Sequence, residues 1–307
     1  MTLTSTPLNH SSETMNISSK ATITFKTKNG LQSIEVVNKH CSTEILVYGA
    51  QVLSFKPHTT TDLLWKSTIT HYTEGKAVRG GIPLCFPWFG PHQTDRKLPA
   101  HGFARTSHWT IESITDLDDE STRLVLTFAS SDHTRTLWPF NFSARVVIIT
   151  GVSLDVTLHY TNTDTAPFTV TSALHSYFNI SDIGNIVIDG LQNKSYLQGV
   201  ESTQIETQQE QLLPITKEEN RRYNGHNGTC TIIDKGFNRK IIVGKRNSHS
   251  TVVWNPWIES TKTFADMEPD GYKTMICVEP SNIGDYAVVL KPGESSLIST
   301  IVSVEML

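Results

Sequence analysis

Short stretches in which apolar and polar residues alternate recur along almost the whole chain, and no stretch has a long helical spacing of apolar residues. Alternation with a period of two, in segments rich in Val, Ile, Thr and aromatic residues, is typical of half-buried β-strands. Many strands without intervening helices argue against a parallel sheet built from βαβ units. The sequence therefore predicts an all-β fold, a large antiparallel β-sandwich or barrel with a few short helices.

The predicted strands extend from residue 21 to residue 304. They are Ala21–Lys28, Gln32–Val37, Glu44–Phe55 (two strands bent at Gly49), His108–Ile114, Arg123–Phe128, Ala144–Thr150, Val152–Tyr160, Phe168–Leu174, Asn185–Ile188, Cys230–Ile233, Lys240–Val243, Thr251–Trp254, Thr274–Val278, Ala287–Leu290 and Ser295–Val304. Two β-branched runs flank Thr150 and Gly151, a pattern typical of a tight hairpin turn. Short helices are predicted only near Ile69–Glu74 and Glu259–Ala265, and the polar stretch Gln204–Gly228 is predicted to be rich in loops.

The domain organisation is expected to be simple. Residues 1–20 are rich in Ser, Thr and Asn without periodicity, and we expect them to form a disordered tail. No linker and no repeat of fixed period interrupts the rest of the chain. A β-sandwich can use a length of this order as one domain, so we expect a single domain over residues 21–307.

Composition and charge exclude several classes of function. The 307 residues include 26 basic and 30 acidic side chains, a net charge of −4, which argues against a polycationic grip on nucleic acid. No stretch is apolar enough for a signal peptide or a membrane span, so we expect a cytoplasmic protein with no membrane partner. The four cysteines are far apart and form no CxxC pair, so we expect buried, reduced thiols rather than a zinc site or a disulfide framework.

Two glycine- and proline-rich segments interrupt the strand pattern and carry arginines. The segment Ala77–His92 places Arg79 immediately before a Gly-Gly pair, which permits close backbone approach. In Leu98–Arg105, an extended backbone would put His101 and Arg105 on one face. Two converging guanidiniums would bind a phosphate or a carboxylate. The alternatives are that Arg79 is a solvated loop residue, as a lone arginine before such a turn usually is, and that the second segment is a surface hairpin.

Two further segments carry groups that suit proton transfer. His175 follows an apolar run, and imidazole titrates near neutral pH, although a hydrogen-bonded core histidine is the common alternative. Glu279 ends an apolar strand, and burial of a carboxylate is costly unless the group is paired or functional. A glycosidase would need a second prominent carboxylate, and no Gly-x-Ser-x-Gly motif supports a serine hydrolase. The pair suits acid–base chemistry that needs neither a cofactor nor a metal ion.

The four segments together, RGGIPLCFPWFGP, LPAHGFAR, TSALHSYFNISDI and VVWNPW…DGYKTMICVEP, closely resemble the signatures of the aldose 1-epimerase (mutarotase) superfamily. The resemblance is strongest to its glucose-6-phosphate 1-epimerase branch and runs from about residue 22 to the C-terminus. It implies a galactose mutarotase-like supersandwich with the site in a cleft across one sheet. It also implies that Glu279 takes the proton of the anomeric hydroxyl and that His175 protonates the ring oxygen.

The resemblance implies substrate-binding roles for other residues. Arg79 and Arg105 resemble the phosphate-binding arginines of this branch, and His101 resembles a second histidine that hydrogen-bonds the sugar. Trp254 would offer an aromatic face to the ring, although a hydrophobic strand residue is the simpler interpretation. Two positions depart from the family pattern: Ala100 stands where a glutamine is frequent, and Asn220 where an aspartate holds sugar hydroxyls.

We therefore expect a cofactor-independent, monomeric mutarotase that interconverts the α and β anomers of a hexose 6-phosphate, with glucose 6-phosphate as the first candidate. One alternative is a non-catalytic phosphosugar-binding or regulatory module on the same fold, which only Asn220 favours. The other is a mutarotase for non-phosphorylated aldoses. Arg79 and Arg105 argue against it, because a neutral sugar would leave two guanidiniums without an anion.

Overall fold

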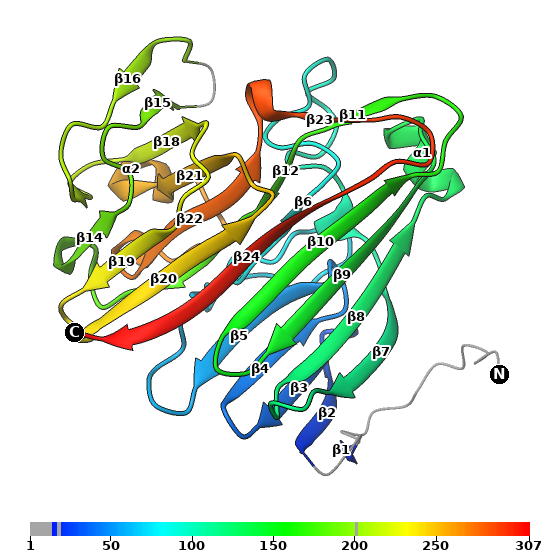
Figure 1. Ribbon diagram of the computed structural model, residues 1–307, viewed down its shortest axis with the longest axis horizontal. Helices are drawn as coiled ribbons and strands as arrows, with labels where there is room; N and C mark the ends of the chain where they lie inside the picture. Colours follow the sequence, from blue (N-terminus) through cyan, green and yellow to red (C-terminus); the bar gives the residue numbers. More distant parts are fainter. Residues whose placement is uncertain (1–13, 17–19, 200–201) are drawn as a thin grey trace.

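The computed structural model describes residues 14–16, 20–199 and 202–307. In this part of the chain, every ladder between the named strands is antiparallel, and the strands form three large sheets and one small one (Figure 1). The five-stranded sheet has the order β1 (Thr14–Asn16), β2 (Ala21–Lys28), β3 (Leu31–Asn38), β4 (Cys41–Leu46) and β5 (Gln51–Pro57). The small sheet pairs β11 (Phe168–Val170) with β23 (Val288–Leu290).

The nine-stranded sheet has the most strands of the three large sheets. Its order is β17 (Leu213–Pro214), β14 (Ile186–Asp189), β19 (Cys230–Asp234), β20 (Arg239–Arg246), β24 (Ser295–Met306), β10 (Leu154–Asn162), β9 (Phe142–Thr150), β8 (Thr122–Ala129) and β7 (Thr110–Asp116). In Figure 1, β24 runs diagonally through the molecule between β20 and β10. This strand joins the two halves of the sheet.

The eight-stranded sheet carries the candidate site. Its order is β16 (Ile205–Thr207), β15 (Ser195–Gln198), β18 (Glu219–Asn224), β21 (Ser250–Asn255), β22 (Met275–Asn282), β12 (Ser172–Leu174) and β6 (Leu84–Cys85), and β13 (Tyr177–Asn179) also pairs with β22. The helices of the described residues are short: α1 (Asp132–Leu137), α2 (Trp257–Thr261), η1 (Ala104–Thr106), η2 (Ile183–Asn185), η3 (Gly271–Lys273) and η4 (Gly284–Tyr286). No helix in that part of the chain has the length and apolar character needed to span a membrane.

One hydrophobic core joins the inner faces of the three large sheets. Its buried residues include Ile23 and Phe55 of the five-stranded sheet, Val146 and Leu158 of the nine-stranded sheet, and Val253 and Ile276 of the eight-stranded sheet. Alternate residues of each strand point into this core, as the period of two requires. The prediction of an all-β antiparallel sandwich with a few short helices is thus confirmed.

Several local predictions are also confirmed. The hairpin of β9 and β10 turns at Gly151, with Thr150 directly opposite Leu154. The predicted bend at Gly49, where φ is +78°, separates β4 from β5. All four cysteines are buried and free of disulfides.

Three local predictions need correction. Residues 69–74 form turns and irregular backbone rather than a helix, because Ile69 is exposed and offers no apolar face to bury. The helix predicted at 259–265 is α2, which begins earlier and ends at Thr261. The stretch Gln204–Gly228, predicted to be rich in loops, contains the inner strand β18. The buried Glu219 of this strand is paired with Arg221 (2.7 Å). Because polar residues take buried positions here, the strand lacks the alternation of apolar and polar residues that predicts strands.

Two features were not predicted from the sequence. Helix α1 begins at a capping box, in which Ser131 and Thr134 exchange side-chain-to-backbone hydrogen bonds. The tail predicted over residues 1–20 lies largely outside the described residues. Within it, Thr14–Asn16 form β1, which pairs with β2.

Candidate active site

The face of the eight-stranded sheet that points away from the main core gathers several residues singled out from the sequence. In β22, Ile276 lies in the core, so Cys277 and Glu279 project from the opposite face. Trp254 of β21 is directly opposite Cys277, and Asn220 of β18 is directly opposite Trp254. Since direct cross-strand partners share a face, strand register brings these positions to one surface.

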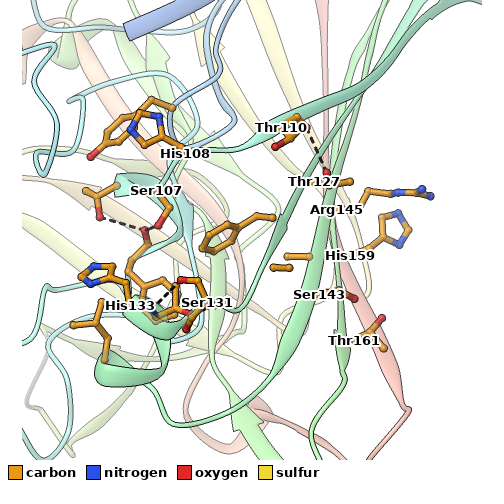
Figure 2. A pocket seen from close by; sticks show the side chains of 18 of the residues that line it. Ser107, His108, Thr110, Thr127, Ser131, His133, Ser143, Arg145, His159 and Thr161 are labelled. Carbon is orange, nitrogen blue, oxygen red and sulfur yellow. Dashed lines mark hydrogen bonds between the residues drawn. The ribbon is translucent and has the colours of Figure 1, made fainter. Parts of the chain in front are cut away.

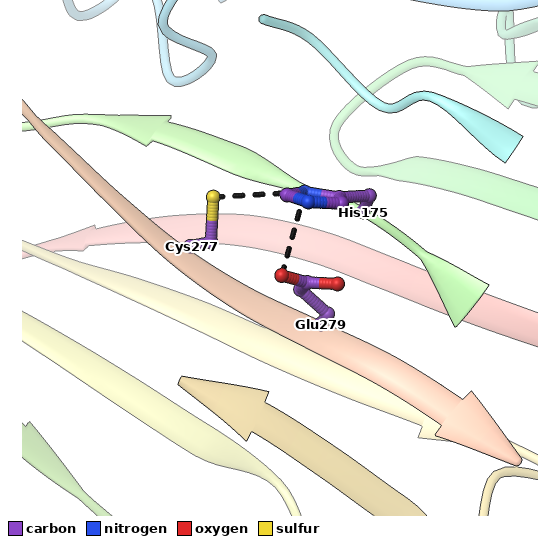
Figure 3. A group of neighbouring side chains, drawn as sticks. All are labelled: His175, Cys277 and Glu279. Carbon is purple, nitrogen blue, oxygen red and sulfur yellow. Dashed lines mark hydrogen bonds and ion pairs between the residues drawn. The ribbon is translucent and has the colours of Figure 1, made fainter. Parts of the chain in front are cut away.

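His175 and Glu279 lie together at the centre of this surface. His175 occupies the link between β12 and β13, where its backbone N–H donates to the carbonyl of Pro83 (3.0 Å). Its Nδ1 is 3.4 Å from Oε1 of Glu279 and 3.7 Å from Sγ of Cys277 (Figure 3). The imidazole stacks on the ring of Tyr177, with centroids 4.7 Å apart. The exposed fractions are 7 % for His175 and 1 % for Glu279, so both groups are shielded from bulk water.

Burial perturbs both groups in the direction that disfavours charge. It lowers the pKa of His175 to about 3, and the positive charges of Arg105 and Arg79 act in the same direction. It raises the pKa of Glu279 well above its usual value, while the charge of Arg105 partly opposes this. Both shifts favour an uncharged pair. Transfer of the carboxyl proton to Nδ1 of the imidazole, 3.4 Å away, converts this uncharged pair into an imidazolium–carboxylate ion pair.

Arg79 is held beside this pair by three contacts. Its Nε donates to Oδ1 of Asp266 (2.7 Å), and Nη1 donates to the hydroxyl of Tyr177 (3.4 Å). The guanidinium lies 4.4 Å from the centroid of the Phe264 ring. The Gly-Gly pair makes the approach possible, since a Cβ on Gly81 would lie 2.1 Å from the carbonyl oxygen of a residue in β5.

The segment with His101 and Arg105 is not extended, so the predicted reason for their common face is wrong. His101 and Gly102 have φ of +67° and +72°, and Arg105 lies in η1. A Cβ on Gly102 would lie 2.1 Å from the carbonyl oxygen of Phe86, which requires glycine. The left-handed turn and the short helix, rather than strand alternation, orient these two side chains.

The ring of His101 packs against that of His175, with centroids 5.5 Å apart. The backbone N–H of Gly90 donates to its Nδ1 (3.3 Å), and the Sγ of Cys85 lies 3.3 Å from the same atom. Burial, with the nearby charge of Arg105, lowers the pKa of His101 well below its usual value. His101 is therefore neutral, with its proton on Nε2, which can donate to a ligand.

Arg105 has no carboxylate partner among the described residues. Its Nη2 donates to the carbonyl of Ala100 (2.9 Å), so the backbone of this position anchors the arginine. Its charge influences the pKa of both His175 and Glu279. Arg105 is thus a half-buried cation near the pair, with hydrogen-bonding capacity left for an anion.

Trp254 and Asn220 lie on the same sheet face as Glu279. The Trp254 ring meets His175 edge to face, with centroids 6.0 Å apart, and also contacts the ring of Phe264. Asn220 is half-buried, and its backbone carbonyl accepts a hydrogen bond from Gly199 (2.7 Å). Trp254 therefore lies beside the pair, whereas Asn220 shares its sheet face one strand further away.

Sequence reasoning missed three residues of this site. Tyr177 lies two positions after His175, and Cys277 lies two positions before Glu279. Since alternate residues of a strand share a face, strand alternation could have predicted that both lie in the site. Asp266 had no such signal, because it lies in a loop far along the chain from its partner.

A separate cavity of about 1290 Å³ lies beside β7, β8, β9 and β10. Figure 2 shows His108 and His133 on one side of the strands and Arg145 and His159 on the other. None of the residues named above for sugar chemistry lines this cavity. Its lining includes an ion pair of Glu74 with His108, but neither His175 nor Glu279. We therefore assign the candidate active site to the eight-stranded sheet.

Comparisons with known proteins identify the family of the chain. The family model described as aldose 1-epimerase matches residues 32–303. A protein of Cenchrus ciliaris named "Putative glucose-6-phosphate 1-epimerase" is 34 % identical over 88 % of this chain and 83 % of its own. A protein of the same name from Escherichia coli is 32 % identical over 88 % and 90 %.

A solved structure from Salmonella typhimurium, described as a "putative mutarotase", superposes with a TM-score of 0.88 at 28 % identity, covering 96 % of this chain and 97 % of that one. A galactose mutarotase related enzyme from Lactobacillus acidophilus, 16 % identical, has a TM-score of 0.72 over 89 % of this chain and 97 % of its own. The fold is thus galactose mutarotase-like, as expected. On the evidence of the family model and of relatives that align over most of their length, the chain belongs to the aldose 1-epimerase family.

Proposed function

We propose that this aldose epimerase interconverts the α and β anomers of a hexose 6-phosphate, with glucose 6-phosphate as the first candidate. The observation that carries the proposal is the buried contact of 3.4 Å between His175 Nδ1 and Glu279 Oε1. A guanidinium without a carboxylate partner, that of Arg105, lies close enough to influence both groups. Proton transfer and anion binding are therefore available in one place.

The two groups divide the proton transfers of ring opening. The step proceeds from the ion-pair form, in which the shared proton lies on His175. The Glu279 carboxylate removes the proton of the anomeric hydroxyl, and the His175 imidazolium protonates the ring oxygen, so the bond between C1 and the ring oxygen breaks. Rotation about the C1–C2 bond presents the other face of the carbonyl. Reclosure reverses the two roles and returns each proton. The pair ends with the protons with which it began, so the reaction needs no cofactor and no covalent intermediate.

The surrounding residues bind and orient the sugar. The proton on Nε2 of His101 can donate to a sugar oxygen, since Nδ1 is already an acceptor. The half-buried ring of Trp254 can pack against the apolar side of the sugar ring. Asn220 offers both a donor and an acceptor to hydroxyl groups, but it carries no charge. These roles rest on their shared sheet face.

Arg79 and Arg105 contribute unequally to the proposed phosphate site. Arg79 already has a carboxylate partner in Asp266 (2.7 Å). Within the described part of the chain, Arg105 donates only to the backbone carbonyl of Ala100. Because Arg79 is paired with Asp266, a neutral sugar in the site would leave only Arg105 without an anion, not both arginines. This pairing favours a second candidate function, the mutarotation of non-phosphorylated aldoses, which the experiment must therefore include.

Saturation-transfer NMR of anomer exchange tests the proposal. Glucose 6-phosphate and free glucose are measured in parallel with the protein at micromolar concentration, and exchange without protein is subtracted. Faster exchange of the phosphosugar alone is the expected result. Equal acceleration of both sugars would assign the protein to the second candidate. Line broadening of the phosphosugar without faster exchange would overturn catalysis and indicate a binding module.

A further inference from the structure

One ring nitrogen of His175 has two other potential metal ligands beside it. Nδ1 lies 3.4 Å from Oε1 of Glu279 and 3.7 Å from Sγ of Cys277. Figure 3 shows both side chains approaching the same edge of the imidazole. The three ligand atoms all lie within 4.8 Å of one another, and all three residues are buried. Thiolate sulfur, imidazole nitrogen and carboxylate oxygen are each ligands that Zn²⁺ takes in proteins.

The two separations measured from Nδ1 of His175 match those of a tetrahedral zinc site. Zinc binds sulfur at about 2.3 Å, nitrogen at about 2.05 Å and oxygen at about 2.1 Å. At the tetrahedral angle, these bond lengths place nitrogen and oxygen ligands ~3.4 Å apart and nitrogen and sulfur ligands ~3.6 Å apart. The distances from Nδ1 of 3.4 Å and 3.7 Å therefore need almost no change. Sγ and Oε1, which lie within 4.8 Å of each other, would meet at ~3.6 Å in the same geometry. We propose that His175, Cys277 and Glu279 form a three-ligand site for Zn²⁺ or a related divalent ion, with the fourth position open.

A second observation points to a ligand at this place. The Oε2 atom of Glu279 is buried and makes no hydrogen bond with any described residue. A carboxylate with an unsatisfied buried oxygen gains from a cation, because burial without a partner is costly. The nearby charges of Arg79 and Arg105 oppose a bare divalent ion. One carboxylate and one thiolate cancel the charge of Zn²⁺, so the complete complex is neutral and this opposition is reduced.

Metal binding must release protons. The metal replaces the proton of the Cys277 thiol, which leaves to solvent, and it replaces a second proton wherever Glu279 is protonated. Because the same atoms of His175 and Glu279 would serve proton transfer, the bound metal would block catalysis. This inhibitory consequence rests on the proposed function, whereas the binding itself does not. The site is thus an inhibitory metal site that competes with sugar turnover.

Cobalt absorption spectroscopy tests the binding without any assay of activity. Co²⁺ alone is added to the metal-free, full-length protein, and a thiolate-to-cobalt charge-transfer band and the visible bands of tetrahedral cobalt are recorded. Zn²⁺ is then added and is expected to abolish both. Cys277→Ser should lose the charge-transfer band. The matched control Cys230→Ser, which removes another buried thiol from β19, should retain it.

Each result of this titration either supports or overturns the metal site. A thiolate band that survives Cys277→Ser, or no band in the wild type at stoichiometric metal, would overturn the site. If Cys277→Ser does not fold, as judged by circular dichroism, His175→Asn in the same titration must lose the tetrahedral bands. In the exchange assay, the Zn²⁺ concentration for half-inhibition should rise about tenfold or more in Cys277→Ser, since even outer partners of a metal ligand contribute about 10- to 100-fold in affinity. A protein that gives the cobalt band but no sugar exchange would refute the proposed function and leave the metal site standing.

Discussion

Replacing Arg105 should reduce the preference of the protein for a phosphorylated sugar. This guanidinium is half-buried, donates to the carbonyl of Ala100 (2.9 Å) and has no carboxylate partner among the described residues. Its remaining donors suit a phosphate, and a charge-assisted hydrogen bond contributes about 1.5–3 kcal/mol. Since 1.4 kcal/mol corresponds to a factor of ten, Arg105→Ala should lower kcat/KM for glucose 6-phosphate by about 10- to 150-fold.

The ratio of the two kcat/KM values, for glucose 6-phosphate and for free glucose, is the quantity to measure. Free glucose has no group for Arg105 to bind, so the ratio should fall by about the same 10- to 150-fold. Arg105→Lys should give an intermediate ratio, because lysine keeps the charge but loses the planar fork. Arg145→Ala is the matched control: this exposed arginine of β9 is paired with Glu112 (2.6 Å) on the outer side of the sheet.

Saturation-transfer NMR with each sugar at several concentrations gives both constants. A ratio that stays within about twofold of the wild-type value in Arg105→Ala would refute the reasoning, because independent changes add to within that error. A parallel loss for both sugars would mean that Arg105 acts only by orienting or polarising the pair. In that case its influence on the pKa of Glu279 would be its main role.

Three further predictions concern catalysis and stability. Glu279→Gln and His175→Asn should each slow anomer exchange by about 10²- to 10⁴-fold with an unchanged circular dichroism spectrum; full exchange in both would contradict the assigned roles. Arg239→Met should lower the free energy of unfolding by about 2–5 kcal/mol in a urea titration. The reason is that the fully buried guanidinium donates to the carbonyls of residues 61 and 179 (3.1 and 2.7 Å). Unchanged stability would show that these hydrogen bonds do not stabilise the fold. Burial lowers the pKa of Lys245 from 10.5 to about 8 in the folded protein. Between pH 8 and pH 10.5, Lys245 is therefore protonated in the unfolded chain but largely neutral in the folded one, so the free energy of unfolding rises with pH in this range. Relative to Lys245→Met, the wild type should gain up to about 3 kcal/mol across this window, and a constant difference in urea midpoints would argue against it.

Much of the local structure could be read from the sequence, because strand alternation and turn chemistry depend on neighbouring residues. The hairpin at Gly151 and the bend at Gly49 lie where their patterns place them. The same local reasoning failed where polar groups replace apolar ones. Strand β18 was hidden because Glu219 and Arg221 satisfy each other within the sheet.

The candidate site was only partly accessible from the sequence. The four segments, and their resemblance to a family, singled out His175 and Glu279, and the family membership is confirmed. Alternation along one strand indicates which residues share a face, but it does not indicate which distant strand lies alongside. Only the pairing of β18, β21 and β22 brings Asn220 and Trp254 to the face of Glu279.

Tertiary structure alone decided the electrostatics of the site. The partner of Arg79 is Asp266, which lies 187 residues away in a loop, and Cys277 contacts an imidazole 102 residues away. Desolvation by the whole fold shifts the pKa of His175 and that of Glu279 in opposite directions. The sequence by itself determined most strands and turns and the side chains that are available for binding and proton transfer. Their distances, charges and exclusion from water arise from contacts between segments far apart in the chain, which no local pattern encodes.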